Sequence, residues 1–311
     1  MGSYDSVSET GAIETGVIET IGFVGFGEAA YHIAKGLREA GLSRTCAYDI
    51  NARTAGPGDK IRARAEETRT ELLDSNAALA SACNMLFSAV TADQALKAAQ
   101  QTAPYLGAGH YYTDLNSVSP RMKQAIGRTV SAVGARFVEA AIMAPVPPHG
   151  HRVPTLLGGE AAPAFLDLLR PFGVRMEVVS TDQIGRAAAV KMFRSIVYKG
   201  LEALMLECVL GASQYGAEPR VFASLNQSFP GVDFQKLADY MIGRVAIHGE
   251  RRAREMEEVA NTLRESGIEP IMAEATARRM DWAAGCGLRE HFGGEFPKSY
   301  KDVLEAVLVK R

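Results

Sequence analysis

Short apolar runs alternate with helix-like segments through the first 180 residues of the chain. The runs are short and rich in β-branched residues, as buried strands are. They fall at 21–24, 45–50, 84–90, 110–116, 135–143, 154–160 and 175–180. Helical spacing or composition predicts helices at 30–41, 58–65, 91–103 and 120–133, with a short helix before the last strand. Strands that alternate with helices in this way predict a parallel, doubly wound sheet.

The pattern changes at Asp182. Residues 184–216 contain no proline and read as one long helix, too long for a compact α/β layer. The segments that follow are helical in pattern, at 219–227, 233–265, 270–284 and 297–309. We therefore predict an α/β class fold. A Rossmann-type sheet domain at 20–182 precedes an all-α domain at 183–311, and the long helix links the two.

Composition narrows the class of protein. The chain has 311 residues, of which 47% are hydrophobic and 23% charged, and its net charge is −2. This balance excludes a nucleic-acid or membrane-surface protein, and no apolar run approaches the ~18 residues of a membrane span. Four cysteines without a C-x-x-C pair suggest reduced thiols and a cytoplasmic protein. Residues 1–19 are acidic, and we expect a flexible leader or at most a short added edge strand.

Two glycines, Gly25 and Gly27, separate the first strand from the first helix. A helix usually begins at Ser, Thr, Asp or Asn, whose side chain accepts from its first N–H groups. Here Gly25 permits a tight turn, Gly27 lets the backbone approach a ligand, and the N–H groups of Glu28 and Ala29 are available to a pyrophosphate. The alternative is an ordinary tight strand-to-helix turn.

Asp49 ends the second predicted strand, where a carboxylate can accept both ribose hydroxyls of an adenosine and repel a 2′-phosphate. It therefore favours NAD over NADP, although Asp49 could also be a simple turn residue. Val90 and Thr91 end the third strand, on the ribose and nicotinamide side. NADP stays the alternative cofactor because basic residues follow Asp49, at Arg53, Lys60 and Arg62.

A polar line runs along the long helix, which is otherwise apolar nearly all round and is expected to be largely buried. It consists of Lys191, Arg194, Ser195, Tyr198 and Glu202, at helical spacing. Burial lowers the pKa of a lysine, so Lys191 could exchange a proton near neutrality. Oxidation of an alcohol by NAD requires such a base. The alternative is that the polar line faces water or a partner subunit.

These segments together resemble the β-hydroxyacid dehydrogenase superfamily, which includes 3-hydroxyisobutyrate and 6-phosphogluconate dehydrogenases. The resemblance covers nearly the whole chain from residue 20. "GFVGFGEAAYHIAKGL" is similar to the cofactor signature and "DLNSVSP" (114–120) to the D-x-S-T-x-x-P substrate segment. "FVEAAIMAPV" (137–146) takes the place of a second substrate segment, and "GRAAAVKMFRS" (185–195) is similar to the catalytic signature.

The resemblance assigns roles residue by residue. Lys191 takes the place of the catalytic lysine, and Ser195 that of an asparagine four residues later. Arg194 stands just before it. Asn116 and Ser117 take the positions that hold the substrate carboxylate or hydroxyl. The resemblance therefore implies a small-molecule substrate, expected to be a carboxylate, with Lys191 as general acid and base.

The resemblance is closest to a 6-phosphogluconate-dehydrogenase-like branch with its own compact helical C-terminal domain; "KMFRS…KGLEAL" and "PHGHRVP" are typical of it. Two departures bear on the substrate. The family's Gly-Gly anion site would fall at Ala144-Pro145, where the proline has no N–H to donate. Tyr198 stands where phosphogluconate decarboxylation requires a glutamate. We expect neither phosphogluconate as substrate nor an obligatory decarboxylation.

Three histidines carry weaker signals. His149 and His151 lie in a proline-rich loop, but no further ligands complete a metal site, so we expect no metal and a substrate-side loop. His248 and Arg252 have no partner at helical spacing, unlike the charges around them. They could reach a substrate anion, with His248 as a binding residue across a homodimer. The alternative is an ordinary solvated helix face.

The sequence thus predicts an NAD(P)-dependent oxidoreductase that acts on a small β-hydroxy acid or a hydroxy-amino acid. An imine reductase on the same scaffold is the alternative enzyme, but Lys191 disfavours it because the lysine is commonly replaced there. A non-catalytic nucleotide-binding protein is the alternative outside enzymes. We expect a homodimer that binds neither nucleic acid nor membrane.

Overall fold

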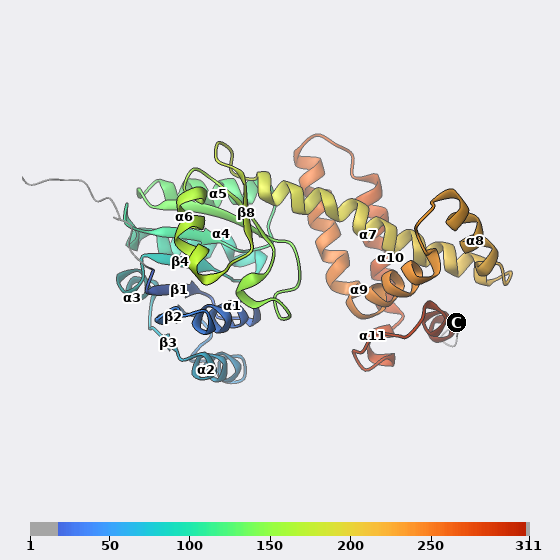
Figure 1. The fold of residues 1–311 in the computed structure, drawn as a ribbon, viewed down its shortest axis with the longest axis horizontal. Coiled ribbons are helices and arrows are strands. Elements are labelled where there is room, and N and C mark those ends of the chain that lie inside the picture. Colours follow the sequence, from blue (N-terminus) through green and yellow to red (C-terminus); the bar gives the residue numbers. More distant parts are fainter. Residues whose placement is uncertain (1–17, 309–311) are drawn as a thin grey trace, which may run out of the picture. The chain divides into compact units, whose positions relative to one another are not determined.

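A computed structural model describes residues 18–308 of the chain. The leader predicted for residues 1–19 lies almost entirely outside the described residues. The structure forms two compact units, which divide between Lys191 and Met192. Figure 1 shows a sheet flanked by helices in the first unit and helices alone in the second. The division falls inside one helix, α7 (Arg186–Ser213), whereas the sequence predicts a boundary at residue 182.

An 8-stranded sheet forms the centre of the first unit, in the order β3-β2-β1-β4-β5-β6-β7-β8. Its strands are parallel except where β6 meets β7. The chain reverses its direction of progress between β1 and β4, which is the position where ligands of such sheets bind. The strands are β1 Thr20–Val24, β2 Arg44–Tyr48, β3 Thr70–Leu72, β4 Met85–Ser88, β5 Tyr111–Asp114, β6 Arg136–Ile142, β7 Thr155–Gly158 and β8 Met176–Ser180.

Helices cover both faces of the sheet. They are α1 Glu28–Glu39, α2 Pro57–Thr68, α3 Asn76–Ala82, α4 Ala95–Thr102, α5 Pro120–Ser131 and α6 Ala162–Leu169. Short 3₁₀ turns lie at Ala92–Gln94, Ala103–Tyr105, Gly150–Arg152 and Arg170–Phe172. Successive residues of β4 show the two faces: Phe87 belongs to the core that includes residues of α1, α2 and α6, and Leu86 belongs to the core that includes residues of α3, α4 and α5. The predicted α/β class with a doubly wound sheet is confirmed.

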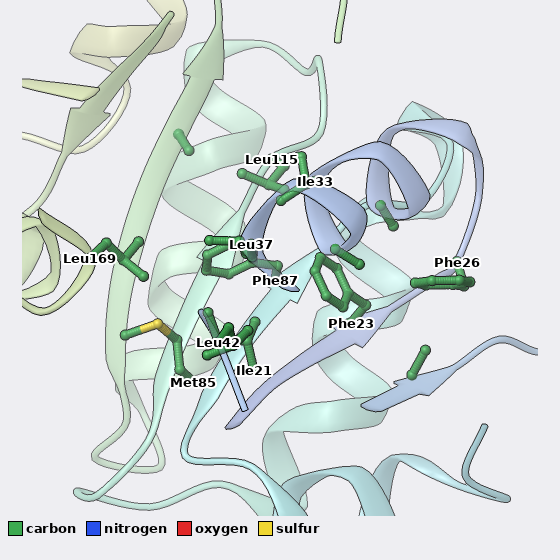
Figure 2. Packing of buried hydrophobic residues seen from close by; sticks show 14 of the residues in the cluster. Ile21, Phe23, Phe26, Ile33, Leu37, Leu42, Met85, Phe87, Leu115 and Leu169 are labelled. Carbon is green, nitrogen blue, oxygen red and sulfur yellow. The ribbon is translucent and has the colours of Figure 1, made fainter. Parts of the chain in front are cut away.

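The core beneath α1 holds the strand ends that carry the glycine loop. Phe23 of β1 and Phe87 of β4 lie edge to face with their ring centroids 5.6 Å apart. Figure 2 shows the two rings together with Ile33 and Leu37 of α1, which belong to the same buried cluster. All four side chains are nearly or fully buried. Because bulky rings fill this space, the start of α1 is fixed relative to the carboxyl ends of β1 and β4.

The second unit is helical throughout its described residues, which confirms the predicted all-α domain. After α7 it contains α8 Glu218–Ser228, α9 Phe234–Glu265, α10 Ile271–Gly285, α11 Leu288–His291 and α12 Tyr300–Leu308. Helix α9 contributes to both apolar cores of this unit, with Met241 in one and Met256 in the other. With 32 residues, α9 is the longest of the described helices, and it packs against α8, α10, α11 and α12.

One expectation about α7 is wrong. The helix is not largely buried, because apolar side chains stay exposed along one side of it. In the second unit these are Phe193 (39% exposed), Val197 (66%), Leu201 (41%) and Leu204 (55%). The polar side chains Lys199 and Glu202 are buried instead. The physical reason is that Lys199 and Glu202 form ion pairs with Glu255 and Arg252 of α9. The side of α7 that faces α9 is therefore polar, and its apolar side chains lie on the exposed side.

Candidate functional site

A cavity of about 390 Å³ lies at the carboxyl ends of β1, β2 and β4. This is the position at which the strand order reverses, where ligands of open α/β sheets bind. Every residue that the sequence predicts for cofactor binding lines it, namely Gly25, Gly27, Glu28, Ala29, Asp49, Val90 and Thr91. Segments distant in the sequence therefore meet at one cavity, as the motif interpretation requires.

Gly25 and Gly27 have different environments. Gly25 has φ +85°, and a Cβ there would lie 2.7 Å from Val90 Cγ1 and 2.8 Å from the Ala89 carbonyl oxygen. Both conformation and packing therefore demand glycine at this position. Gly27 has φ −75°, and no atom lies within 4 Å of its Cβ position. Because Gly27 lines the cavity, this open space is available to a ligand.

Helix α1 begins at this cavity without a side-chain cap. Gly27 is its N-cap residue, and no side chain accepts a hydrogen bond there. The first N–H groups of a helix need acceptors, and the helix dipole favours an anion at this end. A pyrophosphate supplies both the acceptors and the charge. The residues present therefore fit a dinucleotide.

Asp49 organises the glycine loop as well as the turn after β2. Its Oδ2 accepts the N–H of Phe26 at 2.8 Å, and its Oδ1 accepts the N–H of Asn51 at 2.8 Å. Each carboxylate oxygen has a second lone pair, so ribose hydroxyls can still bind. Two of the nearby cations are already paired: Arg53 with Asp74, and Arg62 with Asp59 and the Ala52 carbonyl.

The two residues predicted for the substrate carboxylate lie in different environments. Asn116 is only 6% exposed, and its Oδ1 accepts the N–H of Val90 at 2.8 Å. Its Nδ2 donates to Ser88 Oγ at 3.1 Å and to Asp114. Ser117 is exposed. The structure thus brings Asn116 together with the cofactor-side residues and leaves Ser117 accessible.

A buried carboxylate holds the start of α7, which carries Lys191. Both oxygens of Glu139 on β6 accept backbone N–H groups at 2.6 Å, one from Gly185 and one from Ala188. Glu139 is fully buried. These two bonds satisfy N–H groups that a helix otherwise leaves unpaired. Lys191 follows within one turn and is partly buried.

The remaining predicted residues of α7 belong to the second unit. Ser195 Oγ accepts a hydrogen bond from Lys199 Nζ at 3.1 Å, and Lys199 also pairs with Glu255 at 2.9 Å. Burial lowers the pKa of Lys199, while the charge of Glu255 opposes that shift. Exposed Arg194 lies over the ring of Tyr198, with its guanidinium carbon 5.1 Å from the ring centroid.

Tyr198 and Tyr240 form a hydroxyl pair with their oxygens 2.9 Å apart. Burial, together with the bond to Tyr240, raises the pKa of Tyr198. A phenol with a raised pKa stays protonated at neutrality. Tyr198 can therefore donate a hydrogen bond but is a poor base.

Glu202 and Arg252 form a buried ion pair between α7 and α9. Arg252 has no partner at helical spacing in the sequence; its partner in the structure lies on another helix, which helical spacing along α9 cannot reveal. A second guanidinium, Arg244 Nε, lies 3.5 Å from Glu202. His248 packs against Phe296. Burial and the charges of Arg251, Arg252, Arg244 and Arg289 lower the pKa of His248 to about 4, so the imidazole is neutral at pH 7.

The two loop histidines differ. His149 is exposed, whereas His151 is buried with its Nε2 2.9 Å from the Phe172 carbonyl oxygen. A Cβ at Gly36 of α1 would lie 2.2 Å from His151 Nδ1, so the loop packs directly on the helix that starts at the cavity. Among residues 18–308, no three His, Cys, Asp or Glu side chains gather as a metal site.

Sequence reasoning missed several residues of these sites. The cavity is also lined by Tyr48, Asn76, Gln94, Lys97 and Gln101. Lys97 and Gln101 recur at helical spacing on α4, a signal that could have placed both on one face. Glu139 is the only acidic residue of β6, and a lone carboxylate in an apolar run indicates a buried partner.

Two family models match the chain. The NAD binding domain of 6-phosphogluconate dehydrogenase matches residues 20–148, and a domain of unknown function, DUF1932, matches residues 212–283. A solved structure of a conserved hypothetical protein from Sinorhizobium meliloti 1021 is 33% identical, covers 94% of this chain and 97% of its own, and superposes with a TM-score of 0.80.

The chain belongs to the β-hydroxyacid dehydrogenase superfamily, in its 6-phosphogluconate-dehydrogenase-like branch. The conserved protein MTH1747, of unknown function and described as structurally similar to 3-hydroxyacid dehydrogenases, is 30% identical; the match covers 89% of this chain and 99% of that one, with a TM-score of 0.73. An uncharacterized 28.5 kDa protein of Methanothermus fervidus is 27% identical over 256 residues, or 82% of this chain and 95% of that protein.

Membership in this superfamily gives the first unit a defined role, because the matched family model is a nicotinamide-cofactor-binding domain. The same residues enclose the cavity at the strand-order reversal. Within the described part of the chain, none of the helices is both long and apolar enough to cross a membrane. Family and fold together support activity of the NAD(P)-dependent hydroxyacid dehydrogenase type.

Proposed function

We propose that this protein is an NAD-dependent dehydrogenase that oxidises the CH–OH group of a small β-hydroxy acid or hydroxy-amino acid, or reduces the corresponding keto acid. The main support for this proposal is the cavity at the position where the strand order reverses. It is lined by the uncapped start of α1, by the open side of Gly27 and by Asp49. The described similarity of MTH1747 to 3-hydroxyacid dehydrogenases supports the substrate class.

The cofactor residues divide by the part of NAD that they would hold. The N–H groups that begin α1 at Glu28 and Ala29 would receive the pyrophosphate. Asp49 would accept the adenosine ribose hydroxyls, and Val90 with Thr91 would border the nicotinamide side. NAD is favoured over NADP because a 2′-phosphate would meet the Asp49 carboxylate. Arg53 and Arg62, which could offset that repulsion, are paired with acidic residues.

Lys191 would take the proton of the substrate hydroxyl when NAD accepts the hydride, and return it in the reverse reaction. Tyr198 is disfavoured as the base because its raised pKa keeps the phenol protonated at neutrality. The resemblance also assigns Ser117, Arg194 and Ser195 to the substrate, for which a hydroxyl would supply a hydrogen bond and a guanidinium a charge. His248, neutral at pH 7, would contribute a hydrogen bond rather than a charge.

Phosphogluconate is not the proposed substrate. Its decarboxylation requires an acidic proton donor at the position of Tyr198, and the Tyr198 hydroxyl is held by Tyr240 at 2.9 Å. Pro145 also lacks the N–H that an anion site there would need. The proposed reaction therefore stops at the keto acid, without an obligatory decarboxylation.

The proposal is tested by a panel of β-hydroxy acids and hydroxy-amino acids, with formation of NADH as the readout. Lys191→Met should lower turnover of the best substrate by about 10²–10⁴-fold, the usual contribution of a general base, and leave the affinity for NADH close to wild type. Lys236→Met, on exposed Lys236 of α9, is the matched control and should keep full activity. The pH profile should lose the limb that reports Lys191.

Full turnover by Lys191→Met would reassign the polar residues of α7 to packing or assembly. Tyr198→Phe would then be the next variant, and activity of both would place the chemistry off this helix. Imine reduction in the absence of any hydroxy-acid oxidation would favour the imine reductase alternative. Binding of NADH without oxidation of any hydroxy acid or reduction of any imine would favour a nucleotide-binding protein.

A further inference from the structure

The backbone after β4 leaves the sheet beside the cavity. The N–H of Ala89 still donates to the Val24 carbonyl at 2.9 Å, and the N–H of Leu115 donates to the Ser88 carbonyl at 3.0 Å. The next N–H, that of Val90, has a side chain as its acceptor, Asn116 Oδ1 at 2.8 Å. Asn116 therefore sets the path of the chain at the first residue beyond the sheet.

The orientation of the Asn116 amide is fixed from the other side. Its Nδ2 donates both hydrogens, to Ser88 Oγ at 3.1 Å and to Asp114 Oδ1. A flipped amide would place an NH₂ group against the N–H of Val90 and an oxygen against a carboxylate. Only the observed orientation satisfies all three neighbours.

Asp114 is held in turn by a buried lysine on α5. Lys123 Nζ donates to Asp114 Oδ2 at 2.6 Å, to the Asp114 carbonyl at 2.7 Å and to the Ala140 carbonyl at 2.9 Å. These three bonds use all the hydrogens of an ammonium group. Asp114 and Lys123 are 0% and 1% exposed. A fully satisfied buried network of this kind is rigid.

The position that this network fixes is the Val90–Thr91 wall of the cofactor cavity, which lies next to the Gly25 turn. Val90 and Thr91 line the cavity, and a Cβ on Gly25 would lie 2.7 Å from Val90 Cγ1. A small displacement of Val90 would therefore either collide with the Gly25 turn or widen the cavity. Neither Asn116, Asp114 nor Lys123 lines the cavity itself.

We infer that Asn116 is a positioning residue for the nicotinamide cofactor, which holds the Val90–Thr91 side of the cavity through the Val90 N–H, and that the Asp114–Lys123 pair fixes the orientation of its amide. This role differs from the substrate contact that the family resemblance implies for Asn116. The inference rests on the proposed function only in taking NAD as the occupant of the cavity.

The test compares NADH and AMP as ligands by calorimetry. Asn116→Leu keeps the size of the side chain and removes the acceptor for Val90, so NADH should bind about tenfold more weakly. AMP carries only the adenosine end of the cofactor, assigned to Asp49, and should bind within about twofold of wild type. Ser88→Ala removes one acceptor of the Asn116 amide and should weaken NADH by about threefold.

Ile126→Ala is the matched control for loss of stability. Ile126 is a fully buried core residue of α5 and does not line the cavity. Its truncation should lower the melting temperature and leave the affinity for NADH unchanged. If Asn116→Leu does not fold, Ser88→Ala decides the matter alone.

Wild-type affinity for NADH in Asn116→Leu or, where that variant does not fold, in Ser88→Ala would overturn the inference. Equal weakening of NADH and AMP would also overturn it, because it would indicate a general loss of structure. A wild-type protein that binds no NADH would instead refute the proposed cofactor.

Discussion

Gly25 and Gly27 are glycines for different physical reasons, and substitution can separate the two. The Cβ position of Gly27 has no neighbour within 4 Å, and its φ is ordinary for any residue. Gly27→Val should therefore leave the melting temperature near wild type and place its side chain in the cavity, with NADH affinity lower by about tenfold or more. Calorimetry and thermal unfolding of the same sample measure both quantities.

Gly25→Ala is the contrasting variant. Because Gly25 has a φ of +85° and an added Cβ would collide with Val90, this substitution should destabilise the fold by about 1–3 kcal/mol. A Gly27→Val protein that binds NADH normally would show that the open space at Gly27 does not receive the cofactor.

His248 should make the second unit less stable in mild acid. Its pKa is lowered from the usual 6.5 to about 4 in the folded chain. Above pH 6.5 the imidazole is neutral in both states and contributes no pH dependence. Between pH 6.5 and 4 the unfolded chain binds a proton that the folded chain does not, so the free energy of unfolding falls by at most about 1.4 kcal/mol per pH unit. Partial exposure of the ring reduces that figure.

Trp282 on α10 is the single tryptophan, so its fluorescence reports unfolding of the same unit. Urea titrations at pH 7 and pH 5 should show a smaller loss of stability for His248→Asn than for wild type. Equal losses in the two proteins would mean that carboxylates, not His248, govern the acid response.

At the scale of residues, the sequence predicts what depends on local geometry. Gly25, Gly27 and Asp49 could be placed because a strand, a turn and a helix start occupy one continuous stretch, and all three line the cavity. The buried pairs could not be predicted. Glu202 and Arg252 are separated by 50 positions, and Glu139 and Ala188 by 49. No periodicity within one helix or strand encodes a contact between two of them.

At the scale of elements, Glu139 should determine where α7 begins. Glu139→Ala leaves two buried N–H groups without acceptors and should cost about 2–3 kcal/mol. Glu139→Gln keeps one acceptor but places an NH₂ group against the other N–H, so it should cost less than alanine. Hydrogen exchange at residues 185–188 should accelerate in both variants, because the N–H groups of Gly185 and Ala188 lose carboxylate acceptors while the rest of the helix keeps its hydrogen bonds.

Ser75→Ala provides the comparison, since Ser75 caps α3 with one bond of 3.1 Å to the N–H of Ala78. Its loss should cost about 1 kcal/mol and leave exchange at 185–188 unchanged. Protected amides in Glu139→Ala would mean that packing, not the carboxylate, holds the helix start. Because Lys191 follows closely, a frayed start should also reduce turnover.

The elements that the sequence predicts are those with strong apolar periodicity. The missed elements are short or weakly apolar: β3 is the three-residue stretch Thr70–Leu72, and α3 is the alanine-rich stretch Asn76–Ala82. The edge strand β3 is stabilised by pairing with β2, which its own sequence does not show. The length of the apolar segment predicts helix α7. Its exposed side cannot be inferred from the sequence, because an apolar surface has the same pattern whether the same chain or a second subunit covers it.

At the scale of the molecule, the exposed side of α7 in the second unit bears on assembly. Phe193, Val197, Leu201 and Leu204 follow one another at spacings of four, four and three, so they form one apolar stripe on the helix. An apolar stripe exposed on a helix commonly marks an interface. A two-fold axis would pair this stripe with the same stripe of a second copy, which is the commonest arrangement in homodimers.

We therefore predict a homodimer through α7. Light scattering should give twice the chain mass of 33.4 kDa. Val197→Glu combined with Leu204→Glu should yield monomers, because a charge brought into an apolar interface without a partner is strongly unfavourable. Both side chains are more than half exposed in the single chain, so the variant should keep its fold and its Trp282 fluorescence. Tyr105→Glu, at an exposed apolar position of the first unit, should leave the dimer intact. A wild-type monomer at all concentrations, or a dimer that persists in the double variant, would assign the α7 stripe to some contact other than self-association.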